Sequence, residues 1–143
     1  MNFLASAASG HGRRAGEKIF GMDVQRFGQR CSGRQGEGAD VVVRFFVGKN
    51  AKVRYVEKHY GSGEGEGKRI LNPVTEVFME ENSLMEMEMV QIKGVDSTDR
   101  RTEAELAAGA SLVVRERLMT HGSQSAVSFY EVKLNGEGSS ADV

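Results

Sequence analysis

A repeated turn-and-strand pattern constrains the fold of this chain more than any other feature, and it is clearest between Val47 and Gly94. In each repeat an Asn or Gly, which tolerates left-handed backbone angles, precedes a small residue and then a run of alternating or β-branched residues. The turns are Gly36 to Val41, Gly48 to Val53, Glu80 to Met85, Ala107 to Leu112 and Gly136 to Ser139. Val53, Met85 and Leu112 are therefore expected to occupy equivalent positions, about 30 residues apart.

A second strand fits between successive turns. The segments that fill this space are Ile70 to Met79, Arg101 to Leu106 and Ala126 to Leu134. A unit of two strands and two connections cannot bury its own apolar face, so it must stack on its neighbours. We therefore predict an all-β fold, a β-helix (solenoid) of about 30-residue two-strand repeats. A β-sandwich is less favoured, because Asn135-Gly136 is the sole pair typical of a tight hairpin turn.

Alternation inside the strands predicts which side chains face the interior. Met85, Met87 and Met89 fall on one face of a strand, and the intervening glutamates fall on the other. Long helical patterns are nearly absent. Only Thr102 to Ala108 is compatible with a helix, and its glutamates alternate equally well as strand residues.

Size and charge limit the class of protein. A chain of 143 residues is the size of one domain, and a net charge of −1 gives no overall attraction to nucleic acid or to an anionic membrane. Residues 1–35 are rich in Gly and Arg and are predicted to be weakly structured or non-native, whereas residues 36–143 carry the β-helix. Cys31 is the sole cysteine, which fits a reducing compartment. No apolar run is long enough to span a membrane and no signal peptide is evident, so we predict a cytoplasmic protein.

Several ordered phrases resemble one known family. They are Asn50 to Tyr60, Ile70 to Glu76, Val95 to Thr98 and Leu134 to Ser139. Over about residues 39–143 the chain resembles the shorter members of the SufB/SufD family, the scaffold subunits of the SUF iron–sulfur cluster assembly system. The resemblance implies a right-handed parallel β-helix. It also implies that two such scaffolds pair with each other and with the SufC ATPase, receive sulfur from a cysteine desulfurase, and build a cluster for transfer to apoproteins.

The chain departs from that family's pattern in three ways. The rung from Val74 to Glu80 has no cysteine where SufB-type members carry the sulfur acceptor, and Val143 comes before the distal Cys, His and Glu segment and the helical subdomain that docks SufC. Residues 1–35 match nothing expected ahead of these rungs. Since cluster assembly needs soft thiolates, we expect a β-helix fragment that binds no cluster itself, the iron–sulfur cluster being a transient cargo of the full-length family.

Candidate phosphate and metal sites are weak. The glycine-rich run Gly61 to Arg69 lacks the spacing of a phosphate-binding loop, and its glutamates would repel phosphate, so a solvated loop is expected. The possible metal ligands His11, Cys31, His59 and His121 lack the spacing of a zinc site. We expect the histidines at exposed or rung-edge positions and Cys31 to be an incidental thiol.

Two further groups are assigned structural roles. The methionines Met79, Met85, Met87, Met89 and Met119 are interpreted as adaptable core filling. Arg115, Glu116 and Arg117 are interpreted as a solvated strand face with cross-strand pairs.

The leading functional hypothesis is a non-catalytic scaffold, because the sequence contains no catalytic triad, paired carboxylates or nucleophile elbow. An uncapped last rung would expose a strand edge and favour self-association. A polysaccharide-acting or carbohydrate-binding β-solenoid is one alternative, weakened by the absence of Trp and the presence of only Tyr55, Tyr60 and Tyr130. A truncated or aberrant reading frame without independent function is another. Whether the chain is SufB-like or SufD-like stays open.

Overall fold

The structure is a computed structural model that describes residues 4–11, 20–27, 38–60 and 68–143. The secondary structure of these residues consists of strands joined by turns and short connections. The strands are β1 (Leu4–His11), β2 (Phe20–Phe27), β3 (Gly38–Val47), β4 (Lys52–Tyr60), β5 (Ile70–Met79), β6 (Leu84–Lys93), β7 (Ser97–Leu106), β8 (Ser111–Leu118), β9 (Ser125–Leu134) and β10 (Ser140–Asp142).

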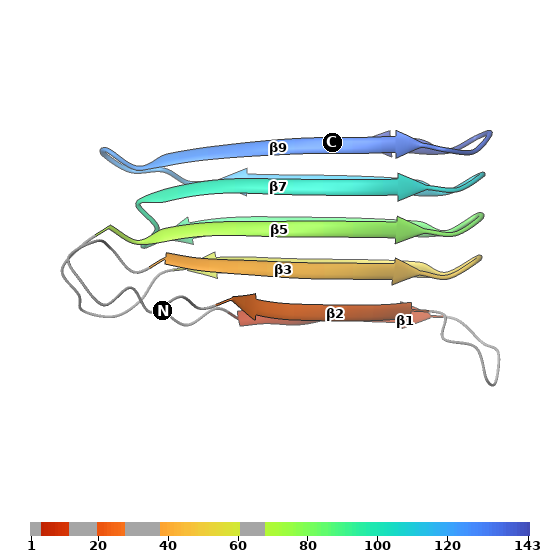
Figure 1. Ribbon diagram of the computed structural model, residues 1–143, viewed down its shortest axis with the longest axis horizontal. Coiled ribbons are helices and arrows are strands. Elements are labelled where there is room, and N and C mark those ends of the chain that lie inside the picture. The colour runs from red at the N-terminus through yellow and green to blue at the C-terminus, as the bar shows by residue number, and fades with distance from the viewer. Residues whose placement is uncertain (1–3, 12–19, 28–37, 61–67) are drawn as a thin grey trace.

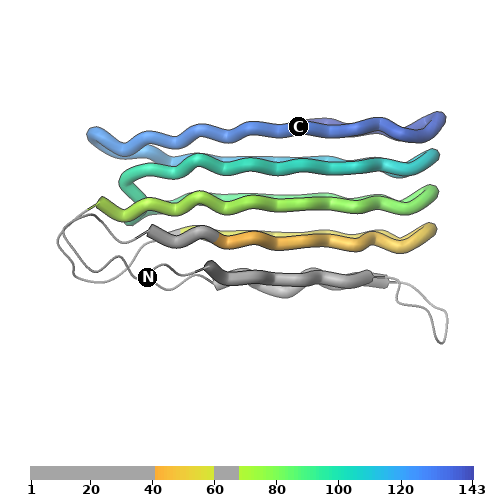
Figure 2. Tube along the Cα trace, in the orientation of Figure 1, coloured from red at the N-terminus to blue at the C-terminus, as the bar shows by residue number. Residues whose placement is uncertain are grey.

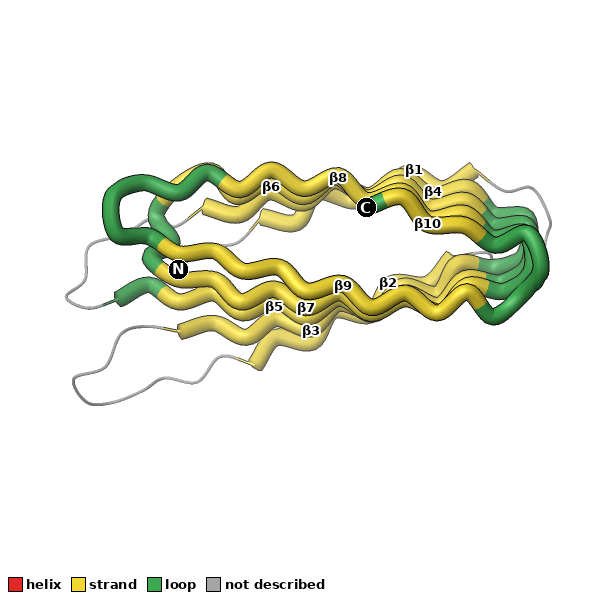
Figure 3. The backbone as a smooth tube through the Cα atoms, turned by 90° about the horizontal axis from the view of Figure 1, so that it is seen from above, coloured by secondary structure: helices red, strands yellow, loops and turns green. Residues whose placement is uncertain are grey.

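The strands form two facing sheets between which the chain alternates (Figures 1 and 3). One sheet has the order β1-β4-β6-β8-β10 and the other β2-β3-β5-β7-β9. The strands β3 to β10 pair with one another in parallel. The two N-terminal strands pair with them in antiparallel fashion, β1 with β4 and β2 with β3. Each circuit passes through one strand of each sheet and rises by one strand in a right-handed sense (Figure 1). The prediction of a right-handed parallel β-helix is confirmed.

The corner between the two sheets repeats as the sequence predicts. Val53 pairs in register with Met85, and Met85 pairs with Leu112. The backbone takes a positive φ at the third residue of each corner: Asn50 59°, Asn82 56°, Gly109 65° and Gly138 70°. The amides of these residues link the corners, since each of the first three donates to a carbonyl of the next corner at 2.9–3.0 Å.

Strand boundaries are largely as expected. The strand Ile70–Met79 is confirmed, and the other two begin earlier than predicted, at Ser97 and at Ser125. The suggestion of a helix from residue 102 is wrong, because that segment completes β7 and enters the next corner. The turn at residues 36–41 is not equivalent to the other turns, since the strand it enters, β3, lies in the other sheet; residues 36 and 37 lie outside the described residues.

The N-terminal segment, expected to be weakly structured, contains the strands β1 and β2. Each pairs with the first parallel strand of its sheet, β1 with β4 and β2 with β3. The chain therefore adds one antiparallel strand to each sheet before the parallel circuits begin.

Apolar side chains fill the interior beside the corners. Phe45 and Tyr55 meet across the two sheets in an edge-to-face contact, with ring centroids 4.7 Å apart. Met85, Met87 and Met89 are buried as predicted. Burying each such side chain stabilises the fold by up to roughly 1.5–3 kcal/mol. Met119, however, is 56% exposed, so its interpretation as core filling is wrong.

Candidate functional site

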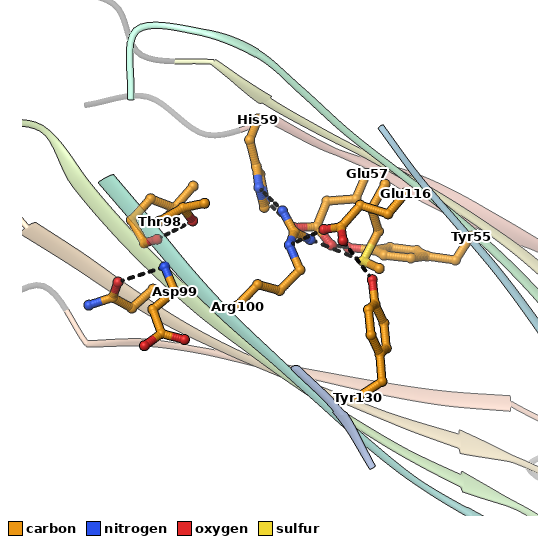
Figure 4. Close-up of polar contacts among 11 residues, drawn as sticks. Tyr55, Glu57, His59, Thr98, Asp99, Arg100, Glu116 and Tyr130 are labelled. Carbon is orange, nitrogen blue, oxygen red and sulfur yellow. Dashed lines mark hydrogen bonds and ion pairs between the residues drawn. The ribbon is translucent and has the colours of Figure 1, made fainter. Parts of the chain in front are cut away.

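The interior of the solenoid is divided into an apolar half and a polar half. Side chains near the corners are mainly Val, Phe, Met and Leu. Farther along the same strands the inward positions become polar: Glu57, His59, Thr75, Gln91, Thr98, Arg100 and Thr102 are all buried. Strands of both sheets contribute, so the polar half is a compartment enclosed by several turns of the solenoid (Figure 4).

Arg100 lies at the centre of this compartment and is completely buried. Its guanidinium extends from β7 toward the opposite sheet (Figure 4). Nη2 is 2.8 Å from His59 Nδ1, and Nη1 donates to Met89 Sδ at 3.0 Å. Nε forms an ion pair with Glu116 Oε1 at 2.8 Å, without the alignment of a hydrogen bond. The Glu57 carboxylate is 4.0 Å from Nη1, so one guanidinium faces a buried carboxylate, Glu57, and a partly buried one, Glu116, whose side chain is 13% exposed.

The side chains of β4 form a chain of polar contacts around Glu57. Tyr55 donates to Glu57 Oε2 at 3.1 Å, and His59 Nε2 contacts the other carboxylate oxygen. Because a guanidinium can only donate, His59 Nδ1 accepts from Arg100, which leaves the imidazole proton on Nε2, facing Glu57. Burial alone would raise the pKa of Glu57. The hydrogen bond from His59, the nearby positive charge of Arg100 and the hydrogen bond from Tyr55 outweigh it, so that the pKa lies below its usual range.

Glu116 anchors the other side of Arg100. Tyr130 on β9 donates to Glu116 Oε2 at 2.8 Å, while the second oxygen faces the guanidinium. Burial, reinforced by the neighbouring carboxylates, raises the pKa of both Tyr55 and Tyr130 well above the usual range. Both phenols therefore remain protonated donors at neutral pH.

Burying these charged and polar side chains carries a desolvation cost that an apolar interior would not have. Buried ion pairs often contribute less than well-packed apolar residues of similar volume. Within the described part of the chain, Gln91 Oε1, Thr102 Oγ1 and Ser128 Oγ are also buried without a hydrogen-bond partner. The described part offers no group of three His, Cys, Asp or Glu side chains placed to hold a metal ion. The contacts in this compartment are hydrogen bonds and ion pairs among carboxylates, a guanidinium, an imidazole and phenols.

Several expectations about single residues are corrected here. His59 was expected to be exposed or at a rung edge, but it is only 5% exposed because its strand position faces the interior. Glu116 was assigned to a solvated face, yet it points inward, whereas its neighbours Arg115 and Arg117 are exposed as expected. Arg117 also makes a cross-strand pair with Glu88 at 3.8 Å.

Among the other histidines, Cys31 and the glycine-rich loop, the structure describes the side chain of His121. His121 is exposed, as expected. The side chain of His11, Cys31 and the loop from Gly61 to Gly67 lie outside the described residues.

The alternation of inward and outward positions along each strand, which is readable from the sequence, indicates this compartment. Arg100 has the same parity as Ala104 and Leu106, which are inward-facing, and Glu116 has the same parity as Leu112. Applying strict alternation from the corner outward would have placed both charged side chains inside.

A parallel β-solenoid with a partly polar interior defines the class of this protein: a β-helical scaffold whose strands stack in register. The family comparison makes the class specific. The chain belongs to the family described as SUF system FeS cluster assembly, SufBD core domain, whose model matches residues 31–143. Neither the search of curated proteins nor the search of solved structures gave a significant match. No helix among the described residues is long and apolar enough to cross a membrane.

Proposed function

We propose that this protein is a non-catalytic scaffold subunit for iron–sulfur cluster assembly that acts in the cytoplasm. Its partners in this proposal are another SufB/SufD-like subunit and a SufC-like ATPase. The match of the SufBD core family to residues 31–143 carries the proposal, and the parallel solenoid agrees with it.

The edge of β9 supports pairing with a second subunit. Within the described residues β9 pairs only with β7, so the far side of this ten-residue strand is open. Exposed edge strands are templates for pairing with another chain. Val127 and Leu134 on this strand are 59% and 54% exposed. We infer that a partner subunit adds its own strand here and covers these side chains.

The carbohydrate alternative gains little from the structure. Sugar-binding platforms present an exposed aromatic ring face, and the outer surface does carry a pair of phenylalanines, Phe46 and Phe78. Their rings stack on each other, with an interplanar angle of 12° and centroids 5.3 Å apart. The faces are therefore turned toward each other, which leaves the ring edges outward.

Light scattering coupled to size-exclusion chromatography tests the pairing surface. The unmodified chain should associate, and Val127→Lys with Leu134→Lys should shift it toward the monomer, because edge lysines oppose strand pairing. Ile92→Lys with Met119→Lys, which changes exposed apolar residues outside β9, is the matched control. A monodisperse monomer before any substitution would contradict the proposal.

Anaerobic reconstitution tests whether this chain itself supplies ligands for an iron–sulfur cluster. A stable cluster needs several soft ligands, and this chain has one cysteine. We therefore expect iron and sulfide added to the isolated chain to be lost on gel filtration. Stoichiometric retention of both would show that the chain itself supplies the ligands.

A further inference from the structure

An aromatic groove lies on the outer face of the second sheet, away from the polar compartment. Phe46 and Phe78 are in register on β3 and β5, and they are 49% and 38% exposed. The groove beside them has a volume of about 300 Å³. It is lined by the two phenylalanines and by corner residues that include Gly48, Glu80, Ala107 and Asn135.

The groove runs across successive turns of the solenoid. Its lining residues come from four consecutive corners, following β3, β5, β7 and β9. Neighbouring strands are about 4.8 Å apart, so the groove is roughly 14 Å long. An extended peptide rises about 3.3 Å per residue, so about four residues would fill that length.

The surroundings of the groove are acidic. Carboxylates on or beside its walls are Glu76, Glu80, Glu81, Glu103, Glu105 and Glu131. The nearby cations Arg44, Lys49, Arg101 and Lys133 each pair with one of them, namely Glu76, Glu81, Glu103 and Glu105 in that order, so Glu80 and Glu131 carry the excess negative charge. Glu76, Glu103 and Glu131 stand in register on three adjacent strands. The acidic residues thus outnumber the cations around an apolar floor, which favours a basic partner and opposes an acidic one.

The same charge argues against a second copy of this chain. A symmetric pair using this face would place like surfaces together, with the glutamate row of one copy near that of the other. Juxtaposed like charges cost free energy at an interface. A basic segment has no such penalty.

We propose that this groove is a docking site for a short extended segment of a partner protein, with an apolar or aromatic residue flanked by Lys or Arg. The apolar side chain enters beside Phe78, and the flanking cations lie against Glu80 and against Glu105, where they compete with Lys133, which pairs with Glu105 at 3.2 Å. This site is distinct from the open edge of β9, although its lining residue Asn135 directly follows that strand, and it does not depend on cluster assembly.

Nuclear magnetic resonance of the labelled full chain tests the site with three capped pentapeptides: Lys-Lys-Phe-Leu-Lys, Glu-Glu-Phe-Leu-Glu and Lys-Lys-Ser-Ser-Lys. The first should shift the amide signals of Gly48, Glu80 and Ala107. The acidic peptide should leave them unchanged, and the serine peptide should bind at least about tenfold more weakly than the first. Raising the salt concentration from 0.05 to 0.5 M should weaken the first peptide several-fold, because exposed charges are screened.

Two sets of variants locate the binding. Phe46→Ala with Phe78→Ala should weaken the first peptide about tenfold or more, whereas Phe129→Ala, an exposed phenylalanine of the same sheet, should not. Glu80→Gln with Glu105→Gln keeps the aromatic floor and should also weaken it, which covers the case in which the alanine variant fails to fold. Equal binding of the acidic and basic peptides, or unchanged binding to both variants, overturns the proposal. Self-association that is lost in the alanine variant, without peptide binding, would assign the face to a second copy instead.

Discussion

Arg100 occupies an inward position on β7 between two buried threonines, Thr98 and Thr102, and its guanidinium is held between Glu116 and the His59 ring. Removing one partner of a buried ionic cluster leaves the other charges uncompensated. Arg100→Met should therefore lower the free energy of unfolding by about 3–5 kcal/mol. Arg101→Met changes the next residue, whose side chain is 57% exposed, and should cost about 1 kcal/mol at most. Denaturant titration of both variants measures the difference, and equal losses would contradict the role given to Arg100.

The carboxyl of Glu57 gives the fold a pH dependence at acid pH. Its pKa in the folded protein lies below the ordinary value of 4.5, so the folded state favours the carboxylate. The stabilisation is present above pH 4.5 and is lost as the pH falls through the folded-state pKa. Glu57→Gln should flatten the decline in melting temperature below that pH, whereas Glu86→Gln on the outer face should not. A variant Glu57→Gln with an unchanged acid profile would refute this assignment.

At the scale of the element, the corners determine the register of every strand that follows. Gly109 has a φ of 65°, and a Cβ there would come 2.4 Å from Asn82 Oδ1 of the preceding corner. Gly122 has a similar φ of 61° but open space around it. Both changes to Ala should cost about 1–2 kcal/mol for the left-handed backbone, and Gly109→Ala should cost more because of the contact with Asn82.

A double-mutant cycle separates the two costs. In an Asn82→Gly background the additional cost of Gly109→Ala should disappear, leaving a value close to that of Gly122→Ala. Thermal or chemical unfolding of the four variants gives the coupling free energy. A coupling of zero would mean that the Asn82 side chain simply moves aside.

The corners were also the most predictable elements, because Asn and Gly mark a positive φ directly in the sequence. Val53, Met85 and Leu112 could be aligned for that reason. The start of β7 could not be predicted, because the charged run from Asp99 to Arg101 obscures the alternation of apolar and polar residues by which a strand is recognised. The buried compartment was missed for a related reason: a single charged residue is normally solvated, and only its contacts across several turns show how Arg100 is compensated.

At the scale of the whole molecule, each turn of the solenoid is supported by the turns on either side of it. Stability in such a stack is approximately a sum over neighbouring units, and the end units open first. In the Val127→Lys with Leu134→Lys variant, in which pairing at the β9 edge is weakened, backbone amides of β5 and β7, each paired on both sides, should exchange with deuterium more than about tenfold more slowly than those of β9. Hydrogen exchange followed by mass spectrometry or nuclear magnetic resonance makes the comparison. Uniform protection across the three strands would indicate that the stack opens as one unit, or that β9 is covered by a partner.

The two ends of each rung differ in how they join the sheets. The first three corners keep one length, from Val47 to Lys52, Met79 to Leu84 and Leu106 to Ser111, whereas the opposite connections vary, with residues 94–96 after β6 and residues 119–124 after β8. Most of the variation in repeat length is therefore absorbed at one end, apart from one additional residue in the last corner, between Leu134 and Ser140, while the strands stay in phase. An affinity tag or a small fluorescent domain inserted next to exposed His121 would extend an already variable connection and leave the stacking of the strands intact.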